Sequence, residues 1–258
     1  MICARCHHFA AAPGATLCHR CLGDSPGPVP AFGSTPGLWL RSPVGLGWAA
    51  AVLLGVVMAA DLFAAWADFL RYDVMGDLMD GETGAGVFLR ADRADALVRL
   101  AARAHAVSMV ACVIVYLCWF RRVRANAQVF DPHRQSMSPG WAIGGWFVPI
   151  ASLWFPRRIT LDIWGASSPW GTTRSHKLVN AWWTLWLVAL FAGRLASAGS
   201  DDGSGNDLGV AWDQAVSVQM LIAHALDLAA AVLAVLLVVR LTRMQHEKAV
   251  AGTAPATV

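Results

Sequence analysis

The residues best suited to chemistry are four cysteines in two Cys-x-x-Cys pairs, Cys3 with Cys6 and Cys18 with Cys21. Two such pairs can present four thiolates to one tetrahedral zinc ion at Zn–S distances of about 2.3 Å. Because four thiolates leave no open coordination position, the zinc would be structural rather than catalytic. The spacing therefore predicts a zinc ribbon over residues 1–24, folded mainly by its metal. A redox dithiol pair or a ribbon that has lost its metal is the alternative interpretation.

A second group of polar residues falls inside long apolar stretches, where charge is costly. Counting residues along each stretch places Asp61, Arg194, His224 and Asp227 at similar depths in the outer half of a helix bundle. Such residues usually face the bundle interior and pair with one another. We expect one cluster. It is either a buried clamp that fixes helix pairing, or a proton or cation relay or ligand site, since histidine beside a carboxylate can change charge near neutral pH.

The elements that carry these residues are transmembrane helices. Hydrophobic residues make up 57% of the chain and charged residues 14%, whereas soluble domains average about 25% charged. An apolar helix of about 20 residues crosses the roughly 30 Å hydrocarbon core of a bilayer. Four segments have this character: about 45–70, 104–120, 178–198 and 215–239. The net charge of +3 is too small to indicate a nucleic-acid partner.

The distribution of basic residues predicts the orientation. Segments 1–44, 121–177 and 240–258 together hold 14 Lys and Arg, whereas the loop 199–214 holds none and has four acids. By the positive-inside rule, both termini and the 121–177 segment face the cytoplasm of a cell (plasma) membrane protein.

The apolar run 141–156 is interrupted by residues that break or bend helices. These are Gly144, Gly145, Pro149 and Pro156. Because both flanks of the run are basic and belong on one side, we expect a re-entrant or interfacial element; a fifth span is the alternative. Broken backbone at membrane depth must pack in protein or line a wet cavity. The element is therefore either a structural plug or the wall of a ligand or lipid pocket.

Five arginines are expected at the cytoplasmic face: Arg121, Arg122, Arg124, Arg157 and Arg158. They anchor the topology in one interpretation and bind anionic lipid headgroups in the other.

The stretch from Trp119 to Pro169 has a distinctive order of motifs: WFRRVRANA, then SPGWAIGGWFVPIASLWFP, then DIWGASSP. Paired tryptophans, Trp182 and Trp183, open the next span. The stretch resembles the bacterial membrane family catalogued as domain of unknown function 4328. The resemblance implies a shared architecture over about residues 45–240. It implies no activity, because the family has none established.

The N-terminal cysteine segment in turn resembles short bacterial zinc ribbons that begin membrane proteins. Pro13, Gly14 and Ala15 match the pattern before the second cysteine pair. His7 and Leu22 stand where such ribbons often have glycine.

The sequence thus predicts an all-α membrane protein with four transmembrane helices, a broken re-entrant or interfacial element and a small N-terminal zinc ribbon. Its expected parts are the ribbon at 1–24, a flexible linker at 25–44, the transmembrane domain at 45–240 and a disordered cytosolic tail at 241–258.

Two functions remain open. The first is a non-enzymatic sensor, scaffold or assembly module whose ribbon contacts a cytosolic protein partner. The second is a transport-type protein that handles a small ligand, protons or lipid through the polar cluster. An intramembrane enzyme is the least favoured class, because the sequence has no phosphate loop, dinucleotide fingerprint or HExxH helix.

Overall fold

The computed structural model describes residues 40–169, 172, 174–198 and 207–252. The chain divides into two units, Met1–Leu38 and Trp39–Val258, and every described residue belongs to the second. The predicted zinc ribbon at 1–24 and nearly all of the predicted linker at 25–44 lie outside the described residues.

Four long helices dominate the described unit: α2 (Val44–Met79), α3 (Ala85–Phe130), α6 (Lys177–Ala198) and α7 (Asp207–Ala251). All four are long and apolar enough to cross a membrane, so the prediction of four such helices is confirmed. Large apolar side chains also cover their outer faces. Val110 is 61% exposed and Leu195 is 73% exposed, as expected where hydrocarbon rather than water is the solvent.

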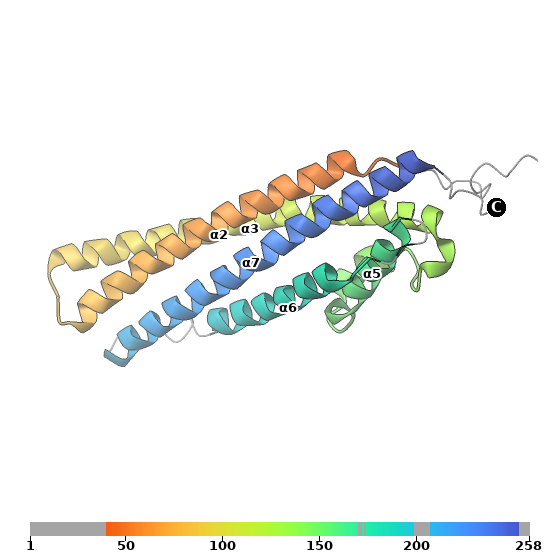
Figure 1. Ribbon diagram of the computed structural model, residues 1–258. Helices are drawn as coiled ribbons and strands as arrows, with labels where there is room; N and C mark the ends of the chain where they lie inside the picture. Colours follow the sequence, from red (N-terminus) through yellow and green to blue (C-terminus); the bar gives the residue numbers. More distant parts are fainter. Residues whose placement is uncertain (1–39, 170–171, 173, 199–206, 253–258) are drawn as a thin grey trace, which may run out of the picture. The chain divides into compact units, whose positions relative to one another are not determined.

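The long helices lie in the order α3, α2, α7, α6 (Figure 1), and each packs against its neighbour in that order. Neighbouring helices are antiparallel. The ends formed by residues near Val44, Phe130, Lys177 and Ala251 therefore gather at one side, where the sequence predicts the cytoplasm.

The α2–α3 hairpin is longer than a bilayer requires. Its 36-residue first helix spans about 54 Å at 1.5 Å per residue. The sequence predicts the first span over about residues 45–70, but α2 continues to Met79, and Val74 and Met75 are buried on its added turns. The turn is confined to the residues between the two helices, where Gly81 has a φ of 88° that suits glycine.

The run 141–156 forms no spanning helix. It divides into α4 (Trp141–Phe147), a short 3₁₀ turn η2 (Ala151–Leu153) and the start of α5 (Phe155–Ser167). Val148 is extended before Pro149, as the residue before proline prefers. Pro156 lies in the first turn of α5, where its missing N–H costs nothing. A Cβ on Gly145 would lie 3.1 Å from the Cβ of Phe155, so this glycine permits α4 to approach α5.

Helix α7 differs from the predicted tail at 241–258, since it remains helical to Ala251. Leu241, Met244 and Gln245 are buried, each at most 3% exposed. The polar run RLTRMQHEK has the composition of a tail, but its periodicity is helical. One face of this last stretch packs into the bundle, and the other carries the charge.

Candidate functional site: an acid and histidine cluster between three helices

The deepest charged group in the apolar part of the bundle is the Asp61 carboxylate on α2, which is 1% exposed. Its Oδ1 lies 2.8 Å from Nδ1 of His105 on α3 and 3.6 Å from Nδ1 of His224 on α7. The opposite ring nitrogen of His224, Nε2, lies 3.2 Å from Oδ2 of Asp68. We call Asp61, Asp68, His105 and His224 the acid–histidine cluster. It connects three helices through side chains that can change charge.

Helical spacing explains why these residues meet. Asp61 and Asp68 are seven residues apart on α2, two turns along one face. His105 falls on the stripe that α3 buries, together with Ala101, Ser108 and Cys112. Since α2 packs between α3 and α7, its carboxylates can contact a histidine from each side.

His224 lies between two carboxylates of α2. A neutral imidazole has one N–H donor, whereas the imidazolium has two. His224 faces a carboxylate through each of its ring nitrogens. The Nε2–Asp68 contact is within hydrogen-bond distance, whereas the Nδ1–Asp61 contact at 3.6 Å is close enough only for an ion pair. Asp227, one turn further along α7, is half-buried and adds a third carboxylate that interacts electrostatically with Asp61 and both histidines.

The structure brings together only part of the set expected from sequence. Asp61 and His224 are in contact, and Asp227 lies within electrostatic reach. Arg194 is exposed on α6 and makes no ion pair with any described residue. Depth along a helix can be counted from sequence, but the face on which a residue lies depends on packing, and Arg194 is on the outer face.

His105 and Asp68 were missed, although the buried stripe of α3 is visible in the sequence as small residues at helical spacing.

The described residues contain no group of three or more His, Cys, Asp or Glu side chains that could hold a metal ion. Three cavities described for this unit, on α6, between α2 and α7, and beside α5, are also lined by other residues. The chemistry available to the cluster is proton exchange coupled to helix contacts.

A second polar region lies at the other end of the bundle and is built from amides. Asn126 Nδ2 donates to the Arg41 carbonyl at 2.8 Å and to Gln245 Oε1 at 3.0 Å. Gln245 Nε2 donates to the Val123 carbonyl at 2.8 Å and to Ser167 Oγ at 3.1 Å. We call Asn126, Gln245 and these partners the amide layer. It ties α3, α5 and α7 to the segment that precedes α2.

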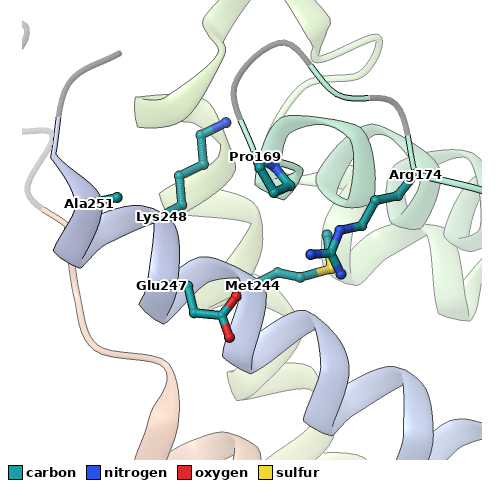
Figure 2. Close-up of a pocket in the computed structure, with 6 residues that line it drawn as sticks. All are labelled: Pro169, Arg174, Met244, Glu247, Lys248 and Ala251. Carbon is teal, nitrogen blue, oxygen red and sulfur yellow. The ribbon is translucent and has the colours of Figure 1, made fainter. Parts of the chain in front are cut away.

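Lys248 extends this region. Its Nζ donates to the carbonyls of Ala166 and Ser168, both at 2.8 Å, and so caps the end of α5. Beside it is a cavity of about 130 Å³ between α7 and the segment after α5 (Figure 2). Arg174 and Glu247 line this cavity, but its apolar wall and small volume give it no evident chemistry.

Four of the five predicted cytoplasmic arginines are bonded within the protein. Arg124 is 3% exposed and donates to Gln128 and to the Met137 carbonyl. The remaining bonds are from Arg122 to the Ser42 carbonyl, from Arg157 to Asn180 and from Arg158 to Ser136. Arg121 is exposed. Four of the five thus contribute to the fold, and two of the five, Arg121 and Arg158, have exposed side chains.

The broken element packs through Trp146 and exposes its tip. Trp146 contacts the rings of Tyr116, Trp183 and Trp186 at centroid distances of 5.7–6.2 Å. Phe147 and Ile150 at the tip are 67% and 69% exposed. The hairpin is therefore attached to the bundle on one side and presents apolar side chains on the other. Of its predicted residues, Gly145 lies at a close approach to α5, and a Cβ on Gly144 would meet the Trp141 ring at 3.8 Å, an ordinary van der Waals distance.

The described unit has the architecture of a multi-pass helical membrane protein, because four of its helices are long and apolar enough to cross a bilayer. The model of DUF4328, a domain of unknown function, matches residues 82–243. Since this match covers more than half of the chain, the protein belongs to the DUF4328 family. No curated protein and no solved structure matches the chain.

Proposed function

We propose that this protein is a non-enzymatic membrane sensor, a module that couples proton binding in the membrane to a cytosolic zinc-ribbon head. In this proposal Cys3, Cys6, Cys18 and Cys21 hold a structural zinc ion, and the head contacts a protein partner. Both termini face the cytoplasm of the plasma membrane. The single observation that carries the proposal is the position of Asp61 between histidines of two other helices.

The contacts give the coupling a physical basis. Each histidine gains a positive charge on acidification, close to carboxylates that are already negative. The contacts between α2, α3 and α7 therefore strengthen as the histidines protonate and weaken as they lose the proton. A change in these contacts alters how α2 packs, and α2 is the helix that follows the N-terminal segment.

A transport-type protein is the competing proposal. It draws on the same cluster, but it requires a path for protons or a ligand across the bundle. The described cavities lie away from Asp61 and Asp227. We therefore favour a sensor over a conduit.

The test is the pH response of the purified full chain with Asp61→Asn. The wild-type protein should have a higher thermal midpoint at about pH 5.5 than at about pH 8, because histidine charges over this range and adds ion pairs only in the folded state. Asp61→Asn should remain folded and lose most of this difference. Asp92→Asn, an exposed carboxylate on α3, is the matched control and should keep it.

Two outcomes would count against the proposal. If Asp61→Asn prevents folding at every pH, the cluster serves only to hold the helices together. If the wild-type protein in liposomes acidifies the lumen when a proton gradient is imposed, and Asp61→Asn abolishes that flux, the protein is a transporter.

A further inference from the structure

A cavity of about 180 Å³ lies between the start of α2 and the last turns of α7. Its walls are mixed in character. Val44, Trp48 and Val239 provide apolar surface, whereas Arg243 and His246 provide two basic side chains. No acidic residue lines it. The cavity belongs neither to the acid–histidine cluster nor to the amide layer.

The level of this cavity along the bundle is that of a membrane interface. The apolar part of α7 ends at Val239, and Arg240, Arg243 and His246 follow. On α2, helix begins at Val44, and Trp48 one turn later is 58% exposed. Tryptophan at the edge of an apolar span is typical of the interfacial belt. The basic groups are thus at the headgroup level and the apolar wall is at the start of the acyl region.

The basic side chains at this cavity are available for a ligand. Arg243 and His246 are both exposed and make no hydrogen bond or ion pair with any described residue. They lie three residues apart, so they project from the same face of α7. Glu247, the nearest acid in sequence, lines the other cavity beside α5. Most of the other cytoplasmic arginines are already bonded to protein groups.

The helix start adds to the positive potential. The first N–H groups of a helix have no partner within it, and Gly45 in the first turn of α2 is exposed. Close packing of the two helices shapes the floor of the cavity. A Cβ on Gly47 would lie 2.9 Å from Cγ2 of Thr242, so only glycine allows this approach.

We propose that this cavity binds the phosphate headgroup of an anionic phospholipid. Arg243 and His246 donate to the phosphate oxygens, the start of α2 faces the same charge, and the glycerol and first acyl carbons lie along Trp48 and Val239. A cavity of this size accommodates one headgroup and is smaller than the 300–1,000 Å³ typical of sites that enclose a whole small molecule. The inference needs only a bilayer around the helices and does not depend on the sensor function.

The first experiment measures binding of phosphatidylglycerol and phosphatidylcholine to the full chain in mixed micelles, with bound lipid counted by native mass spectrometry. The wild-type protein should retain phosphatidylglycerol in preference to phosphatidylcholine. Replacing Arg243→Gln and His246→Gln together should weaken phosphatidylglycerol binding about tenfold, since each interfacial cation contributes a few-fold. Arg121→Gln removes an exposed arginine that does not line the cavity and whose charge is screened by solvent, so it should change binding less than about twofold.

A second measurement does not depend on removing charge. Phosphatidylglycerol with brominated acyl chains quenches tryptophan that it contacts, and Trp48→Phe should remove a distinct share of that quenching. Equal losses in the double variant and in Arg121→Gln would assign the binding to general surface charge and overturn the site. Displacement of the lipid by inorganic phosphate at comparable concentration would assign the cavity to free phosphate and overturn the lipid. Unchanged quenching in Trp48→Phe would also overturn it.

Discussion

Both polar regions of the bundle place polar side chains between packed helices, but they do so with different chemistry. The amide layer uses Asn126 and Gln245, which carry no charge, and each contacts several partners at 2.8–3.1 Å. The acid–histidine cluster uses groups that gain and lose protons, and its contacts range from 2.8 to 3.6 Å. An amide network has one state at all ordinary pH values, whereas a carboxylate–imidazole set has several. The amide layer therefore suits a helix contact that does not change with pH, which we call the fixed joint. The acid–histidine cluster suits a helix contact that changes with pH, which we call the adjustable joint.

The largest effect is expected from breaking the fixed joint. Gln245→Leu roughly keeps the volume of the side chain but removes its hydrogen bonds to Asn126, the Val123 carbonyl and Ser167, whereas Asn126 keeps its bonds to Arg41. Each buried hydrogen bond contributes about 0.5–1.5 kcal/mol, so we expect a loss of about 3 kcal/mol of unfolding free energy. Reversible denaturation in micelles measures this. Gln219→Leu, an exposed glutamine on the same helix, should cost nothing. Equal effects of the two changes would show that the amide layer is not a joint.

The sequence predicted the adjustable region better than the fixed one, and the reason is physical. A charged residue in an apolar run is conspicuous, so the residue order alone singles out Asp61 and His224. Gln245 and Lys248 lie in a mostly polar run after the last long apolar stretch, which is the ordinary composition of a tail. Only the packing of α5 against α7 makes them buried. The four spans and the broken hairpin follow from hydropathy and from the positions of the prolines. The rotation of each helix about its axis depends on contacts that hydropathy does not encode, and this rotation is what excludes Arg194 from the cluster.

Lys248→Met should have the next largest effect. Methionine keeps the apolar stem but leaves the carbonyls of Ala166 and Ser168 at the end of α5 without their donor. It also removes an ammonium group 5.5 Å from the Phe130 ring centroid. We expect a loss of about 2 kcal/mol, measured as for Gln245.

The chain has one other lysine, Lys177, which is exposed at the start of α6 and is the matched control. Lys177→Met should change the unfolding free energy by less than about 0.5 kcal/mol. A similarly small effect at Lys248 would mean that the α5 carbonyls are satisfied without it and that the fixed joint ends at Gln245.

The smallest effect is expected at the adjustable joint, and its dependence on pH matters more than its size. His105→Gln retains an N–H donor that can reach Asp61 Oδ1, so at about pH 8 the loss should be below about 1 kcal/mol. At about pH 5.5 the wild-type protein gains an ion pair that glutamine cannot form, and the difference between the two proteins should widen. His176→Gln, an exposed histidine before α6, should differ from wild type equally at both pH values. A constant difference for His105→Gln would mean that Asp61 and His105 form a fixed hydrogen bond, and the contrast between the two polar regions would then be one of position in the bundle and not of chemistry.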